Sequence, residues 1–137
     1  MTAIENLIPQ RAPMIMIDDL VVASADKAVT KYRVKKNNVF LTDNGYFNES
    51  GLVENIAQTA AAQAGYMAHV NGISPAVGFI AAINALEVYD LPCVNSTVET
   101  TVTVTNRVFD VVIIEGTVEQ NEKLLCRCKM KIFIKPG

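Results

Sequence analysis

Tryptophan is absent from the 137-residue sequence, histidine occurs once and cysteine occurs three times. A single histidine excludes a metal site built from several imidazoles. Among the cysteines (Cys93, Cys126 and Cys128), the last two are separated by one residue, unlike the CxxC pairs of redox and zinc sites. Because alternate residues of a strand share a face, Cys126 and Cys128 are expected to pack together in the core as reduced thiols. We therefore expect no metal.

Long basic runs and long apolar runs are missing as well. No run of Lys or Arg is longer than Lys35-Lys36, and the formal net charge is −2. Nucleic-acid-binding surfaces are usually basic, so we expect no nucleic-acid partner. No stretch of about 18 consecutive apolar residues occurs, and the N-terminus lacks the basic and apolar segments of a signal peptide. The sequence therefore predicts a cytoplasmic protein without a membrane segment.

Only 7 glycines and 5 prolines interrupt a sequence that is 50% hydrophobic. This composition excludes a disordered chain, and the length is typical of one domain. A chain of this size buries enough surface to form a core without disulfide bonds. We therefore expect a single domain over residues 1–137.

Apolar and polar residues alternate in several segments that are rich in β-branched residues, which is typical of strands. The segments are 13–23 and 27–35, joined as a hairpin through Ser24–Asp26, and then 77–89, 97–107, 109–119 and 124–134. Residues 50–70 contain no proline and many alanines, with Ser50 as a possible N-cap and Asn71-Gly72 as a stop signal. Two strands, a long helix and four more strands predict an α+β fold. We expect a curved antiparallel sheet of about five to six strands wrapped around one central helix.

The expected helix has two sides of different character. An apolar arc should face the sheet; it consists of Leu52, Val53, Ile56, Ala57, Ala60, Ala64 and Met67. Another side carries Ser50, Glu54, Gln58, Ala61 and Gly65, and the helix has no Lys or Arg. Because small residues permit close approach, we expect a second subunit, a ligand or both to cover this side. The sequence thus predicts a homodimer with Ala61 or Gly65 near the contact.

Three motifs follow one another along the chain. Residues 7–18 read LIPQRAPMIMID, residues 54–59 read ENIAQT, and residues 79–84 read FIAAIN. In this order they resemble the hotdog-fold 3-hydroxyacyl-(acyl-carrier-protein) dehydratases of bacterial fatty-acid synthesis and their relatives in polyene pigment pathways. The resemblance implies a hotdog fold and a substrate that is an acyl thioester on acyl-carrier protein or coenzyme A. It also implies a reaction that needs no cofactor.

The resemblance further points to two candidate catalytic residues, Glu54 and Tyr46. Glu54 matches the family's helix carboxylate, which belongs to the facing subunit and protonates the departing hydroxyl. Gln58 matches the glutamine that orders this carboxylate. The family's base is a histidine in a Gly-His-Phe-Pro segment, but residues 45–48 read GYFN, so Tyr46 stands in its place. The loop between Tyr46 and Glu54 is also shorter than in the family. A phenol, with a pKa of about 10, is a poor base at neutral pH.

Gln58 and three further residues are the candidate substrate-binding residues. The backbone N–H groups of Gly51 and Leu52, near the helix N-terminus, are in a position to polarise a thioester carbonyl. The packing of Phe79 and its neighbours is expected to set the depth of an acyl tunnel.

Three functions are compatible with these residues. The first is a 3-hydroxyacyl-thioester dehydratase, and the second is a hotdog thioesterase in which Glu54 and a water hydrolyse the substrate. The third is a catalytically silent acyl-binding subunit that completes the tunnel of an active homologue in a hetero-oligomer. Fold alone does not choose among them.

Overall fold

The computed structural model describes residues 3–135. A short 3-10 helix η1 (Ile4–Asn6) precedes β1 (Asp19–Ala23), β2 (Lys27–Arg33) and the long helix α1 (Glu49–Val70). Four strands follow: β3 (Val77–Val88), β4 (Thr97–Val108), β5 (Val111–Gln120) and β6 (Lys123–Lys135). Among the described residues, no helix has both the length and the apolar character needed to cross a membrane.

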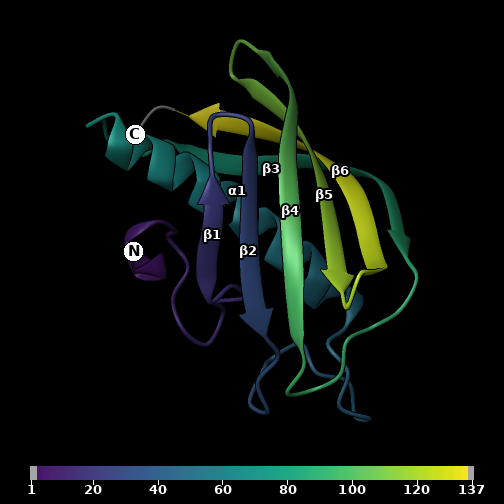
Figure 1. Cartoon of the computed structure of the whole chain (residues 1–137). Helices are drawn as coiled ribbons and strands as arrows, with labels where there is room; N and C mark the ends of the chain where they lie inside the picture. The colour runs from purple at the N-terminus through teal and green to yellow at the C-terminus, as the bar shows by residue number, and fades with distance from the viewer. Residues whose placement is uncertain (1–2, 136–137) are drawn as a thin grey trace.

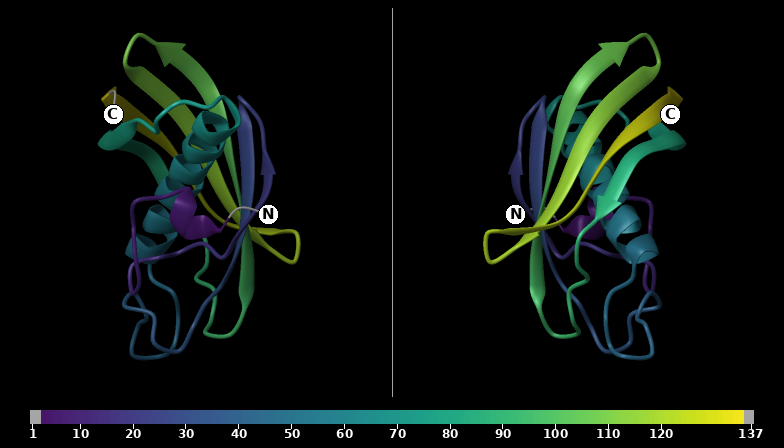
Figure 2. Two further views of the ribbon diagram at one scale, coloured as in Figure 1. Left: turned by 90° about the vertical axis from the view of Figure 1, so that its left-hand side faces the viewer. Right: turned by 90° about the vertical axis from the view of Figure 1, so that its right-hand side faces the viewer.

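The six strands form one antiparallel sheet in the order β1-β2-β4-β5-β6-β3. The pairs β1–β2, β4–β5 and β5–β6 are hairpins, and β2 also pairs with β4. Strand β3 pairs with the last strand, β6, and forms an edge of the sheet. The sheet curves, and α1 lies along its concave face (Figures 1 and 2). This confirms the α+β fold that the sequence predicts.

Helix α1 starts and stops at short polar signals. Asn48, rather than the expected Ser50, is the N-cap, and its side chain accepts a hydrogen bond from the N–H of Gly51. Asparagine is among the best N-cap residues because its short side chain reaches the first free amides. The helix ends at Val70, and Gly72 follows with a positive φ of 65°, which confirms the predicted stop.

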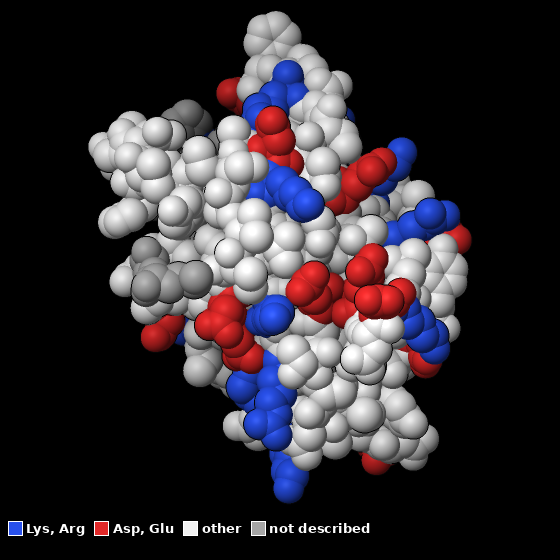
Figure 3. All heavy atoms as spheres, in the orientation of Figure 1, with Lys and Arg blue, Asp and Glu red and all other residues white. Residues whose placement is uncertain are grey.

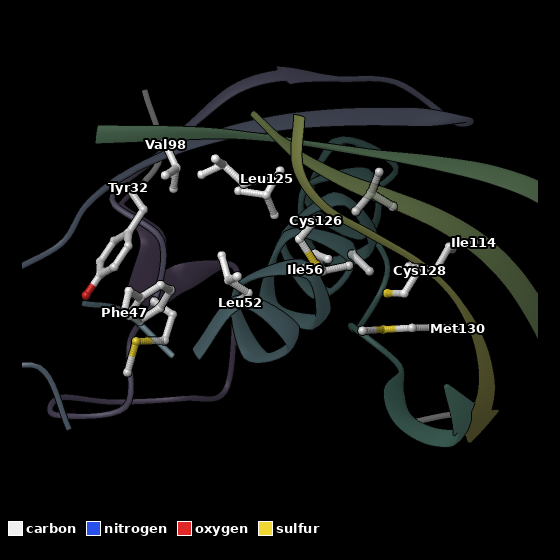
Figure 4. Close-up of a cluster of buried hydrophobic side chains, with 14 of the residues drawn as sticks. Tyr32, Phe47, Leu52, Ile56, Val98, Ile114, Leu125, Cys126, Cys128 and Met130 are labelled. Carbon is white, nitrogen blue, oxygen red and sulfur yellow. The ribbon is translucent and has the colours of Figure 1, made fainter. Parts of the chain in front are cut away.

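The core fills the space between α1 and the middle of the sheet (Figure 4). Gly116 on β5 allows the close approach of the helix, because a Cβ atom there would lie 2.3 Å from Cγ2 of Ile56. Cys126 and Cys128 are buried in this core, as predicted. Burial raises the pKa of the Cys126 thiol to about 12, with a further contribution from Cys128, and raises the pKa of Cys128 to about 11.

The apolar arc of α1 is only part of what faces the sheet. Asn55 and Thr59, which lie off the predicted arc, are fully buried, whereas Ala64 on the arc is exposed. Thr100 donates to the Asn55 side chain, and Thr59 shares a 2.7 Å hydrogen bond with Thr30. Because these polar groups have partners, their burial costs little, and the prediction from apolar residues alone was wrong here.

The chain's own N-terminal segment covers the second side of α1. A Cβ atom on Gly65 would lie 2.1 Å from the carbonyl oxygen of Leu7. Ala61 packs against the cluster that contains Leu7 and Ile8. The expected subunit contact at Ala61 and Gly65 was therefore wrong: residues 3–18 occupy this face (Figure 2).

Candidate functional site

Glu54 lies in the second turn of α1 and is partly buried. Gln58, one turn later, donates a hydrogen bond from Nε2 to a carboxylate oxygen of Glu54 at 2.8 Å. Within residues 3–135, Glu54 belongs to none of the ion pairs. An uncharged donor therefore orients the Glu54 carboxylate.

The Gln58 side chain is held in turn by the segment that precedes β1. Its Nε2 also donates to the backbone carbonyl of Met14 at 2.7 Å, and its Oε1 accepts from the N–H of Met16 at 2.7 Å. Asn55 donates to the carbonyl of Met16 at 2.7 Å. Residues 13–18, expected as the start of the first strand, instead run along α1 because these amides supply their hydrogen bonds. Gln58 is fully buried, so the Glu54 carboxylate has a rigid neighbour.

Tyr46 lies in the loop between β2 and α1. Its N–H donates to Oγ1 of Thr42, its carbonyl accepts from the N–H of Thr42, and it forms an isolated bridge with Cys93. The side chain is 43% exposed. In the described part of the chain, no hydrogen bond joins Tyr46 to Glu54. The next residue, Phe47, turns into the core beneath Gly51.

The N–H groups of Gly51 and Leu52, which we expected to polarise a thioester carbonyl, donate hydrogen bonds to the helix cap residue Asn48. The N–H of Gly51 donates to Oδ1 of Asn48 at 2.9 Å, and the N–H of Leu52 donates to the Asn48 carbonyl at 3.1 Å. Gly51 and Leu52 are also buried. Both amides are therefore already hydrogen-bonded at the start of the helix, and their contact with substrate stays a prediction.

Phe79 lies on the face of the sheet that is turned away from the helix. It pairs with Phe133 on β6, whereas the buried Met130 on the same strand faces α1. Side chains alternate along β6, so Phe133 and its cross-strand neighbour Phe79 lie on the convex face. The structure therefore places Phe79 away from Glu54, and the neighbouring Ile80 takes the concave position beside Ile132.

Sequence reasoning missed the backbone of residues 14–16 and the cap residue Asn48. The former contacts Gln58 across more than forty positions of the chain, and no local pattern signals such a contact. The latter had a signal, because asparagine just before a predicted helix is a favourable cap.

The comparison with solved structures gives the same fold. The dehydratase heterocomplex ApeI:P from Xenorhabdus doucetiae has a TM-score of 0.91 at 13% sequence identity, covering 100% of this chain and 93% of that chain. A hypothetical thioesterase with coenzyme A from Streptococcus pneumoniae TIGR4 has a TM-score of 0.71 at 8% identity, covering 87% and 86%. The protein smu.793 from Streptococcus mutans UA159, bound to acetyl CoA, has a TM-score of 0.69 at 10% identity, covering 87% and 89%. No curated protein matches the chain.

A family model gives the more specific result. The model of the ApeP-like family, described as ApeP dehydratase, matches residues 2–136. This span contains all three motifs and the hydrogen-bonded pair of Glu54 and Gln58. The chain has the hotdog fold and is a member of the ApeP-like family of dehydratases.

Proposed function

We propose that the chain is the carboxylate-bearing subunit of a dehydratase that acts on 3-hydroxyacyl thioesters in fatty-acid or polyene biosynthesis. The observation that carries this proposal is the Glu54 carboxylate, held by Gln58 on the central helix of a dehydratase-family fold. In this proposal residues 1–137 form a single domain that carries this site. Its three free cysteines, Cys93, Cys126 and Cys128, support a reducing compartment such as the cytoplasm.

Dehydration requires one acid and one base. A base removes a proton from C2 of the acyl chain, and that electron pair forms the C2–C3 double bond as the C3–O bond breaks. The departing hydroxyl takes a proton from Glu54 and leaves as water. The base then releases the C2 proton and Glu54 takes up one proton, so both groups return to their starting forms. The products are an enoyl thioester and water, with no change in oxidation state, so the proposed chemistry needs no redox cofactor.

The base would come from a second chain. Tyr46 is half-exposed in a loop, and within residues 3–135 no hydrogen bond joins it to Glu54. In the dehydratases that this sequence resembles, a histidine supplies the base and the carboxylate comes from the facing subunit. The heterocomplex ApeI:P is itself a dehydratase of two different chains. We therefore propose a composite site in which a homologue brings the histidine and this chain brings Glu54.

Strand β3 is the surface proposed for this pairing. It forms an edge of the sheet, and several large apolar side chains on it are exposed, among them Ile80, Ile83 and Leu86. An apolar edge strand of this length is prone to pair with another chain. A second hotdog subunit joined at this edge would continue the sheet and cover these side chains. A homodimer through the same edge is the alternative assembly, and it would hold two Glu54 residues and no loop histidine.

The test offers 3-hydroxyacyl and enoyl thioesters of acyl-carrier protein and of coenzyme A to the chain alone and with a histidine-bearing homologue. Enoyl absorbance follows hydration and dehydration. We expect turnover to need both chains and Glu54→Gln to reduce it by about 10²–10⁴-fold, since proton transfer is lost while shape is kept. Glu49→Gln, on the exposed first turn of the same helix, is the control. Full activity of Glu54→Gln would remove the carboxylate from the mechanism.

Thioester hydrolysis is the second candidate, supported by the fold shared with a coenzyme A-bound hypothetical thioesterase. Release of free thiol, measured in the same reactions, distinguishes it from dehydration. Free thiol without enoyl product would favour hydrolysis by Glu54 and a water. Neither product, with a gain in the homologue's own activity, would favour a silent acyl-binding subunit.

A further inference from the structure

The β4–β5 hairpin ends in a fully exposed aromatic residue. Phe109 forms the tip with Asp110 and has a relative exposure of 102%. Its φ is 53°, a left-handed conformation that two-residue hairpin loops normally give to glycine or asparagine. The hairpin projects beyond the rest of the sheet, and its extreme tip carries uncharged atoms (Figures 1 and 3). Neither folding nor the site at Glu54 accounts for a phenylalanine here.

A shallow apolar hollow lies directly beside this tip. It has a volume of about 400 Å³ and is lined by Val108, Phe109, Asp110, Val111, Lys131 and Phe133. Cross-strand pairing links Val108 to Val111 and Val111 to Phe133, so these three side chains share the convex face. The surface therefore presents an apolar projection and an apolar depression next to each other.

The two charged residues at the hollow, Lys131 and Asp110, form no ion pair within residues 3–135. In contrast, Lys123, Arg127 and Lys129 on β6 each form an ion pair with a carboxylate. The cross-strand neighbours of Lys131 are Ile113 and Ala82, which are uncharged. One acid and one base thus flank the projection and the depression.

We propose that this hairpin binds a second copy of the same chain about a two-fold axis. In that contact the Phe109 ring of each copy enters the hollow of the other, and Asp110 of each copy meets Lys131 of the other. A two-fold contact requires a self-complementary surface, and this surface has the projection, the depression, the acid and the base together. Because it lies on the convex face, the contact would leave the concave site and the β3 edge free.

The first test measures the mass of the purified chain at micromolar concentration by light scattering. We expect Phe109→Asn to have half the mass of the wild type, because it removes the projection while suiting the positive φ of the tip. Val39→Ser, at another exposed apolar loop position, should keep the wild-type mass. An equal mass for Phe109→Asn and the wild type would overturn the proposal. The readout is mass, so it does not depend on whether the chain is a dehydratase.

The second test exploits the exchange of charges between copies. Asp110→Lys alone places two lysines in each contact, and Lys131→Asp alone places two aspartates there, so each variant should have half the wild-type mass. Mixing the two variants pairs opposite charges at both ends of the two-fold contact and should restore the full mass. A mixture that associates no more than either variant alone would overturn the proposed contact.

Discussion

Gln58 donates to the Glu54 carboxylate at 2.8 Å and also binds the backbone of residues 14 and 16, so one buried amide joins the candidate acid to the N-terminal segment. Its Nε2 uses both protons, for Glu54 and the Met14 carbonyl, and its Oε1 accepts from the Met16 N–H. The side chain thus contributes to folding and orients the carboxylate at the same time. The orientation of Glu54 depends on a segment that is remote in sequence.

Replacing Gln58 by leucine should therefore reduce both stability and activity. The substitution leaves the Met16 N–H and the Met14 carbonyl without their partner, which costs about 1–3 kcal/mol in the free energy of unfolding. Urea denaturation measures this loss. Gln120→Leu, at a partly buried glutamine whose side chain donates a surface hydrogen bond to the Thr97 carbonyl, should change stability by less than about 0.5 kcal/mol, because water can replace that bond. Equal effects of the two substitutions would contradict the structural role of Gln58.

Substitution of Gly65 tests what covers the second side of α1. An arginine at this position would collide with the Leu7 carbonyl, so Gly65→Arg should destabilise the folded chain by about 3 kcal/mol or prevent folding. Ala64→Arg, at the exposed preceding residue, should be tolerated. Thermal unfolding compares the two variants. A stable Gly65→Arg protein that merely dissociates into smaller oligomers would instead support the subunit contact expected from sequence.

A charge on β3 should block the proposed subunit pairing. Ile83 is 41% exposed on this edge strand, and Val22 is 48% exposed on β1 at the opposite edge. Ile83→Glu should weaken association at least tenfold, because pairing would bury an unpaired charge, while Val22→Glu should not. Sedimentation with and without the histidine-bearing homologue measures this difference. The reverse ranking would move the interface to β1.

Restoring the family's histidine tests the composite site. Tyr46→His should raise dehydratase activity of the chain on its own if the loop brings an imidazole within reach of the acyl C2, since imidazole titrates near neutral pH. Tyr46→Phe should change activity of the complex less than Glu54→Gln does. Enoyl absorbance with each protein alone and with the homologue gives the comparison. A loss of complex activity in Tyr46→Phe as large as that in Glu54→Gln would make the phenol itself catalytic.

The buried thiols should make stability depend on alkaline pH. The pKa values of Cys126 and Cys128 are raised to about 12 and 11, whereas thiols in an unfolded chain titrate at about 8.5. Between these values the folded state binds more protons, so stability is complete below about pH 8 and falls as pH rises, by up to about 1.4 kcal/mol per pH unit for each thiol. Urea unfolding at pH 8 and pH 10 should show a smaller decrease for Cys128→Ala than for the wild type. An identical decrease in both proteins would contradict this assignment.

The sequence alone determined the order of the helix and strands, most of their bounds and the family. Period-two alternation places β4, β5 and β6 within three residues of their observed ends, because each strand has a buried and an exposed face. The proline-free, alanine-rich stretch before Asn71-Gly72 likewise identified the central helix. Local chemistry was sufficient wherever the pattern of burial repeats along the chain.

Only the tertiary structure decided which groups meet. Gly65 contacts Leu7 and Gln58 contacts Met16 across large sequence separations, and a helical projection shows that a face is covered but not by which segment. It also decided that the Gly51 and Leu52 amides are used by Asn48, and that Phe79 lies on the convex side. These outcomes depend on hydrogen-bond partners and strand register, which are set when distant segments pack and leave no periodic signal in the sequence.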